Sequence, residues 1–196
     1  MKHCEHILAV NSSAFTTTGM VESDISIADV VVAQRKGLEI DPSFRQLITY
    51  AVLKHGNKLA VYRRTPKGGE NRLHGATSVG FGGHIDAVDM SYDENGLLDI
   101  AAVIDTACKR EIQEELDLTR VNVLSEVQLS HKIVLDGNDV DKVHVGIVFA
   151  IEVDSEDVSP AEEQLDWVGF KTYEEILGDA SSEAWTIELV KHLQSL

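Results

Sequence analysis

Short apolar runs separated by polar turns occupy much of the chain, and this pattern predicts strands through its middle. Residues 54–57, Lys-His-Gly-Asn, lie between two such runs and predict a hairpin turn. Residues 136–139 separate two longer runs and predict a second hairpin. The predicted strands are 6–10, 47–53, 59–64, 121–135, 140–153 and 167–170.

Helical spacing of apolar residues appears later in the chain, where we predict helices at 100–116, 173–177 and 182–193. Asp99 stands in the N-cap position of the first of these. Nearer the N-terminus, residues 25–34 are compatible with either a helix or a strand. Strands with interspersed helices indicate an α+β or mixed α/β class. We expect residues 1–45 to form an N-terminal arm packed on a core domain, 46–196.

Composition and charge narrow the function. The chain has 196 residues, enough for one domain, with 33 acidic against 17 basic residues and a net charge of −16. This charge argues against sequence-independent binding of nucleic acid polymers and against adhesion to anionic membranes. No apolar run approaches the roughly 20 residues that span a bilayer. With only two cysteines, we expect a reduced, cytoplasmic compartment.

The charge is distributed unevenly. Residues 54–72 contain six basic residues and one acidic residue, whereas 86–117 contain ten acidic residues and two basic ones. Ordinary surface patterning explains such blocks in many proteins. The sharper hypothesis is that the first segment binds phosphate and the second binds divalent cations.

The predicted helix 100–116 has an unusual face. At about 100° per residue, its apolar residues Ile100, Val103, Ile104 and Ala107 form one stripe about 100° wide. Further along the helix, the same stripe is occupied by three carboxylates. These are Glu111, Glu114 and Glu115. The buried face of the helix therefore becomes acidic toward its C-terminus.

Three carboxylates on a core-side face are unfavourable without a counter-ion. Like charges one turn apart repel, burial raises that cost, and acids near a helix C-terminus oppose the helix dipole. A divalent cation reverses each of these effects, and carboxylate oxygens suit Mg²⁺ or Mn²⁺. The competing explanation is a solvated acidic helix end paired with Lys109 and Arg110.

Residues 110–118, Arg-Glu-Ile-Gln-Glu-Glu-Leu-Asp-Leu, resemble the second half of the Nudix hydrolase signature, Arg-Glu-hydrophobic-x-Glu-Glu-x-Gly-hydrophobic. The preceding pair Gly82-Gly83 looks like the glycine pair that opens that signature. The flanking elements follow the family's usual order, so the resemblance covers most of residues 45–196. The run 73–85 is similar to a little-characterised bacterial or phage-like subgroup with its own N-terminal arm.

The resemblance implies an αβα sandwich around a central mixed sheet, with the catalytic helix near residues 99–117. It also implies Mg²⁺-dependent hydrolysis of a diphosphate linkage in a nucleoside diphosphate derivative or a related small phosphorylated substrate, with Mn²⁺ as a substitute. The implied metal ligands are Glu111, Glu114, Glu115 and the Gly82 carbonyl, with Arg110 beside them. One of these carboxylates, or a loop acid at Glu162 or Glu163, would accept the proton of water, and of the loop acids we favour Glu163. Expected phosphate contacts are Arg63, Arg64, Arg72 and His84, with Arg64 the strongest candidate.

The sequence departs from the usual signature in three ways. Ala102 stands where the family has a glutamate that braces the arginine, so Asp86, Asp89 or Asp99 must replace it. Gly83 lies 27 residues before Arg110, which indicates an insertion within 86–98. Asp117 replaces a glycine and is expected in a left-handed or Asx conformation.

Other functions remain open at this point. One is a catalytically silent Nudix-like sensor that binds a nucleotide or another effector, since Ala102 leaves the signature incomplete. A prenyl diphosphate isomerase ranks lower, because no cysteine lies between Leu47 and Ala107. A purely structural acidic protein leaves the buried stripe unexplained. The sequence does not specify the substrate, and it is compatible with a homodimer.

Overall fold

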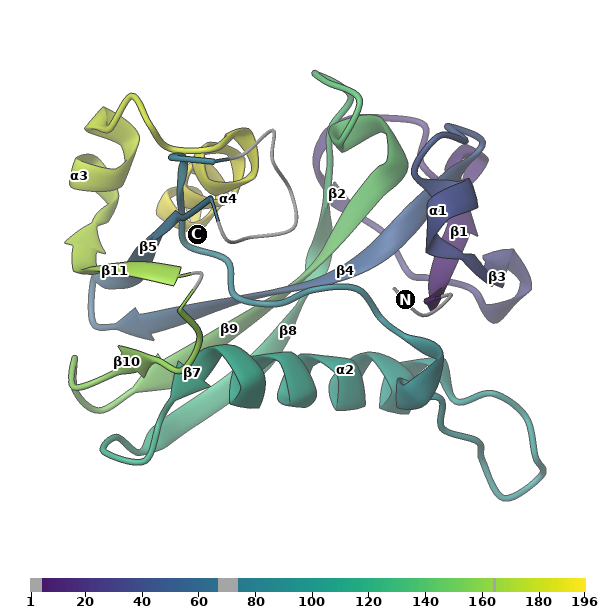
Figure 1. Cartoon of the computed structure of the whole chain (residues 1–196), viewed down its shortest axis with the longest axis horizontal. Coiled ribbons are helices and arrows are strands. Elements are labelled where there is room, and N and C mark those ends of the chain that lie inside the picture. Colours follow the sequence, from purple (N-terminus) through teal and green to yellow (C-terminus); the bar gives the residue numbers. More distant parts are fainter. Residues whose placement is uncertain (1–4, 67–73, 164) are drawn as a thin grey trace.

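The computed structural model describes residues 5–66, 74–163 and 165–196. Its centre is a mixed β-sheet with helices on both faces (Figure 1). The main path through the sheet runs β11-β5-β4-β9-β8-β2, and β4 and β9 form its parallel pair. The strands are β1 His6–Asn11, β2 Gly19–Glu22, β3 Val30–Gln34, β4 Phe44–His55, β5 Lys58–Arg64, β6 Thr77–Ser78, β7 Leu116–Asp117, β8 Val123–Val134, β9 His144–Val153, β10 Ser159–Pro160 and β11 Leu165–Thr172.

Helix α2, Ile100–Glu115, covers one face of the sheet (Figure 1). It begins at Asp99, whose carboxylate accepts a hydrogen bond from the Ala102 amide at 3.1 Å, as the sequence predicts. Its apolar stripe is buried in a cluster shared with β4, β5 and β9. Cys108 is buried in the same cluster.

The opposite face carries α3, Tyr173–Gly178, and α4, Ala184–Ser195. Leu189 and Val190 of α4 are buried against a second cluster on this side of the sheet. The two clusters occupy the two faces of one sheet, so the predicted α+β sandwich is confirmed. A further short helix, α1, spans Arg35–Leu38.

The N-terminal segment joins the sheet directly. β1 pairs with β3 on one side and with the start of β4 on the other, and β2 pairs with the end of β8. Residues 25–34, open between helix and strand in the sequence, form a 3₁₀ turn at Ile27–Asp29 followed by β3. The sequence pattern missed β2, which is only four residues long. The boundary at residue 45 stays a prediction.

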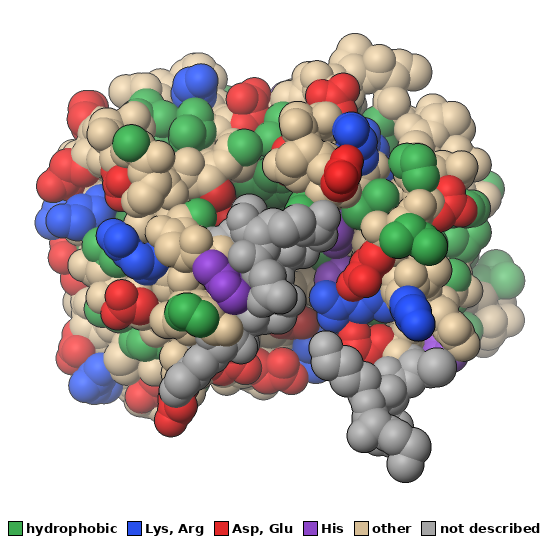
Figure 2. All heavy atoms as spheres, turned by 45° about the horizontal axis from the view of Figure 1, so that its top comes forward, with side chains coloured by type: hydrophobic (Ala, Val, Ile, Leu, Met, Phe, Trp, Pro, Cys, Tyr) green, Lys and Arg blue, Asp and Glu red, His purple; other side chains and the backbone are tan. Residues whose placement is uncertain are grey.

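Both predicted hairpins are present; the strands of the first are longer than expected and those of the second are shorter. β4 extends the predicted strand 47–53 at both ends, and Gly56 turns into β5 with a φ of 60°. β8 and β9 are antiparallel, with irregularities of register between Val123 and Ser125 and between Gln128 and Lys132. None of the helices in the described ranges combines the length and apolar composition needed to cross a bilayer. Figure 2 shows acidic side chains spread over one face, with lysines and arginines between them.

Gly80 permits the glycine-rich segment to pack closely along β4. A Cβ atom at this position would lie 2.0 Å from the ring of Tyr50, which is buried. We therefore expect Gly80→Ala to lower the free energy of unfolding by about 1–3 kcal/mol, the usual cost of overpacking. The matched control is Gly178→Ala, because a Cβ atom there meets nothing within 4 Å. Equal denaturation midpoints for the two variants in urea would contradict this packing.

Candidate active site

A glycine-rich segment runs along β4 and forms one side of the site. Its backbone is hydrogen-bonded to the strand, with the Thr49 amide donating to the Gly83 carbonyl at 2.9 Å. Gly82 has a φ of 140°, and a Cβ atom there would lie 2.1 Å from the Thr49 carbonyl oxygen. Both facts require glycine at position 82.

The C-terminal half of α2 lies against this glycine pair. The Gly82 amide donates to Glu115 Oε2 at 2.7 Å. A Cβ atom at Gly83 would lie 2.8 Å from both carboxylate oxygens of Glu111. The absence of a side chain at 82 and 83 therefore lets two carboxylates approach the backbone.

Burial differs among the three predicted acids. Glu115 is 9% exposed and the side chain of Glu111 14% exposed, whereas the side chain of Glu114 is 53% exposed. The expectation of an inward acidic face thus holds for two residues, and Glu114 lies at its rim. Its carboxylate lies 3.4 Å from Arg110 Nη1.

Burial also changes the acidity of the two inner carboxylates. Removal from water raises the pKa of Glu115 to about 8, and the hydrogen bond from Gly82 only partly offsets this. Burial likewise raises the pKa of Glu111, against the opposing effect of Arg110. In the absence of a cation, the charged forms of both groups are therefore disfavoured.

Arg110 connects α2 to the inserted segment. Its Nε and Nη2 each donate to one carboxylate oxygen of Asp89, both at 2.8 Å, in a bidentate pair. Asp89 is 2% exposed and also accepts from the Asp86 amide in a capping box. Arg110 Nη1 donates to Glu111 Oε1 at 2.7 Å. Of the three acids considered, Asp89 replaces the glutamate missing at Ala102.

The donor set fits a hard divalent cation in chemistry. Glu111 and Glu115 offer buried carboxylate oxygens with raised pKa values, and the backbone of Gly82 lies beside them. Within the described ranges, no three His, Cys, Asp or Glu side chains are already arranged as a metal centre. The residues that would hold Mg²⁺ are therefore adjacent, and their roles as ligands stay a prediction.

A cleft of about 340 Å³ opens beside the glycine pair. It brings together four of the predicted site residues, Gly82, Glu115, Arg64 and His84. It is also lined by residues that sequence reasoning missed, which come from α1 and the start of α4. These are Arg35, Glu39 and Glu183. No motif or periodicity marks them, because only the tertiary fold brings them to the cleft.

Arg64 and His84 differ in their charge. The Arg64 guanidinium is paired with the Glu183 carboxylate at 3.0 Å. Burial places the pKa of His84 well below its usual value, so its imidazole is neutral. His84 Nε2 shares a hydrogen bond with Gln46 Oε1 at 2.8 Å. Any phosphate contact by His84 is therefore a neutral hydrogen bond.

The remaining predicted residues lie elsewhere. Arg63 is exposed and is not among the described residues that line the cleft, and Arg72 falls outside the described residues. Of the two loop acids, Glu162 is partly buried, and burial and nearby Glu114 raise its pKa. Glu163, the favoured one, is exposed. This geometry favours Glu162 as the acid that faces the carboxylate cluster.

Asp117 resolves the last departure from the signature. Its carboxylate accepts from the Thr119 amide at 3.0 Å and from the Thr119 hydroxyl at 2.6 Å, which is an Asx turn. No described residue other than glycine has a positive φ. The left-handed alternative for Asp117 is therefore wrong, and the Asx alternative is confirmed.

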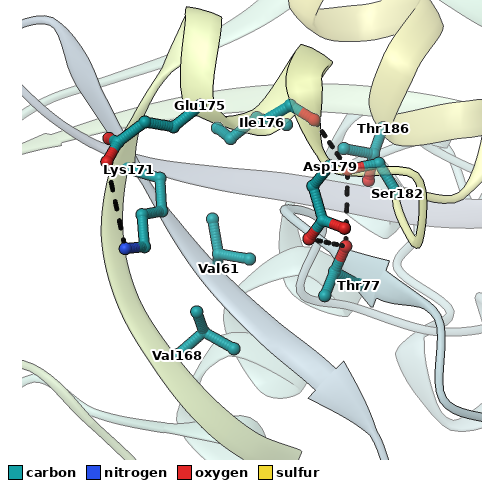
Figure 3. Close-up of a pocket in the computed structure, with 9 residues that line it drawn as sticks. All are labelled: Val61, Thr77, Val168, Lys171, Glu175, Ile176, Asp179, Ser182 and Thr186. Atoms are coloured by element: carbon teal, nitrogen blue, oxygen red, sulfur yellow. Dashed lines mark hydrogen bonds and ion pairs between the residues drawn. The ribbon is translucent and has the colours of Figure 1, made fainter.

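A second pocket of about 210 Å³ lies between β11, α3 and the start of α4 (Figure 3). Asp179 accepts from the Thr77 hydroxyl on one side of it, and Lys171 pairs with Glu175 on the other side. None of the predicted site residues is among the nine described residues that line it. Of the two pockets, only the larger cleft is lined by predicted site residues.

Comparisons with known proteins identify relatives of this chain and its fold. The chain is 33% identical to Protein YmaB of Bacillus subtilis (strain 168) over 148 residues, which cover 71% of this chain and 68% of YmaB. The crystal structure of Tm1382, a candidate Nudix hydrolase, covers 97% of this chain and 99% of its own, with 21% identity and a TM-score of 0.73. The chain has the Nudix fold and belongs to the family of YmaB.

A second Nudix-fold structure is more distant. The Nudix domain of NrtR from Shewanella oneidensis, solved with ADP ribose, covers 77% of this chain and 87% of its own, with 14% identity and a TM-score of 0.50. No family model matches the chain. The Nudix resemblance drawn from residues 110–118 is thus confirmed by the fold.

The raised pKa of Glu115 predicts how stability of this Nudix-fold protein depends on pH. Between its ordinary value of 4.5 and about 8, the folded chain binds more protons at this site than the unfolded chain. Stability without metal should therefore fall as pH rises through this window. In EDTA, we expect the melting temperature to fall more between pH 6 and 9 for the wild type than for Glu115→Gln. The exposed-site variant Glu114→Gln should follow the wild type, and parallel profiles for wild type and Glu115→Gln would contradict the burial.

The Arg110–Asp89 pair generates a second prediction. Asp89→Asn removes the charge that neutralises a partly buried guanidinium, so we expect a loss of about 2–3 kcal/mol in unfolding free energy. Asp93→Asn is the control, because Asp93 lies exposed in the same segment and its Oδ1 contacts are retained by asparagine. Urea titrations measure both variants. Similar stabilities would show that Asp89 does not brace Arg110.

Proposed function

We propose that this protein is a Mg²⁺-dependent hydrolase of a diphosphate linkage in a nucleoside diphosphate derivative or related small phosphorylated substrate. The observation that carries the proposal is the pair of carboxylates, Glu111 and Glu115, held against Gly83 and Gly82, with Glu115 and both glycines lining the cleft. Such an arrangement is unfavourable until a cation compensates it.

The residues divide the chemistry among them. Glu111, Glu115, rim residue Glu114 and the Gly82 carbonyl would hold Mg²⁺ or Mn²⁺, which supplies neutralisation of charge on phosphate oxygens. Arg110 is held by Asp89 and in turn keeps Glu111 in place by a hydrogen bond. Arg64 lines the cleft and would donate hydrogen bonds to a substrate phosphate.

The attacking water needs a proton acceptor. Glu162 is the better placed loop acid, because partial burial and nearby Glu114 raise its pKa, the direction that favours a general base. Glu163 remains the acid that the sequence favoured. The two are separated by comparing the pH dependence of turnover in Glu162→Gln and Glu163→Gln.

A silent sensor is the competing function for this fold. Its motivation was Ala102, which leaves Arg110 without its usual brace. The bidentate contact with Asp89 removes that motivation. A cytoplasmic location and a homodimer remain predictions.

The proposal is tested by a screen with Mg²⁺ across nucleoside triphosphates, nucleotide sugars including ADP ribose, and dinucleoside polyphosphates, in which chromatography detects the nucleotide products, because cleavage of a diphosphate linkage yields phosphomonoesters or pyrophosphate. Glu111→Gln, Glu114→Gln and Glu115→Gln should each lower kcat about 100-fold or more, because metal neutralisation contributes several kcal/mol to the transition state. Circular dichroism should stay unchanged. Glu174→Gln, an exposed acid on α3, is the control and should retain activity.

If none of these compounds is hydrolysed, the result would favour the sensor. Full activity in any of the three glutamine variants would remove that residue from the metal site.

A further inference from the structure

Glu183 is a nearly buried carboxylate outside the Nudix signature. Its side chain is 6% exposed, at the junction between the cleft and the start of α4. It accepts hydrogen bonds from Ser78 Oγ at 2.6 Å and from the Tyr50 hydroxyl at 3.1 Å. It also accepts from Arg64, whose Nε lies 3.0 Å and Nη2 3.4 Å away. A carboxylate this buried is costly unless it is paired.

Helix capping does not explain Glu183. It occupies the N-cap position of α4, yet its side chain makes no capping hydrogen bond. At the equivalent position of α2, Asp99 does cap its helix. The Glu183 carboxylate is directed to Arg64 and the residues beneath it, away from the free amides of its own helix.

The contact with Glu183 fixes Arg64 in one orientation. Two of its three guanidinium nitrogens face the same carboxylate, and the guanidinium carbon lies 5.5 Å from the Tyr62 ring centroid. Among the residues that the structure describes, no hydrogen bond occupies the third nitrogen, Nη1. Arg64 lines the cleft together with Gly82 and Glu115.

We propose that Glu183 is a positioning residue that holds Arg64 so that Nη1 binds a substrate phosphate beside the carboxylates of α2. This inference rests on the proposed function for the identity of the ligand. A guanidinium that is already oriented loses little side-chain entropy when it binds an anion, so the benefit appears in affinity.

Binding of ADP in the presence of Ca²⁺, measured by calorimetry, tests the inference without requiring turnover. Glu183→Gln keeps the shape of the side chain and loses the charge that holds Arg64. We expect its Kd for ADP to rise about tenfold, the value of one charge-assisted hydrogen bond. Arg64→Ala should weaken binding to a similar extent. The double variant should bind no more weakly than Arg64→Ala, because Glu183 acts through Arg64.

Ser78→Ala is the matched control. It removes the shortest hydrogen bond to Glu183 and leaves the pair with Arg64, so it should lower the melting temperature without changing the Kd for ADP. Additive losses in the double variant would overturn the inference. So would an unchanged Kd in Glu183→Gln, or no binding of ADP by the wild type.

Kinetics with a substrate found in the screen separate this inference from the proposed function. Glu183→Gln should raise KM about tenfold while kcat stays within about threefold of the wild type, since the orientation of Arg64 serves binding. If the wild type hydrolyses a diphosphate and KM does not change, only the inference fails. If Glu183→Gln weakens ADP binding through Arg64 as expected but none of the compounds is hydrolysed, only the proposed function fails.

Discussion

The packing of two carboxylates against a glycine pair is the constraint on which the site depends. Glu115 receives a hydrogen bond from Gly82, and Glu111 lies where any side chain at Gly83 would stand. This contact requires the C-terminal end of α2 to lie directly against the backbone of Gly82 and Gly83, which follow β6. It also leaves charged oxygens away from water, which raises the pKa of both groups. A cation bound there would turn this unfavourable arrangement into a stable one.

Arg110 extends that constraint into the inserted segment. Its bidentate pair with Asp89 ties α2 to the 3₁₀ turn Ala87–Asp89, and a third nitrogen holds Glu111. Neighbouring Nudix-fold structures share the fold, and here the bracing acid comes from outside the helix. The segment between the glycine pair and α2 is therefore part of the site's support, and Asp89 links it to the helix in a single buried interaction.

Local pattern predicted the features that depend on local sequence. The hairpin of β4 and β5 followed from apolar runs around a Gly-Asn turn, and α2 followed from its cap and stripe. The angular positions of the residues around the helix also placed Glu111 and Glu115 on the core side. They could not show that the Glu114 side chain, on the same stripe, is 53% exposed, because exposure depends on what packs against the end of the helix. Asp86, Asp89 and Asp99 were equivalent in sequence, because only tertiary packing selects the acid that reaches Arg110.

The far wall of the cleft lay beyond sequence reasoning for the same reason. Arg35 and Glu183 are separated by most of the chain and meet at the cleft only through the sheet order. Neither belongs to a motif, and a partly buried arginine beside a carboxylate has the same sequence appearance as a surface ion pair. From the two charge blocks of the sequence, Arg64 and Glu115 are the charged residues that line the cleft among those described, and only the fold selects them.

The central claim is that bound metal compensates the inward carboxylates, and the Mg²⁺ dependence of thermal unfolding at pH 8 tests it most directly. At about 100 times its Kd, Mg²⁺ should raise the melting temperature of the wild type by about 5–10 °C. The double variant Glu111→Gln/Glu115→Gln should show no such rise. An equal rise in both proteins, or none in the wild type, would contradict the account.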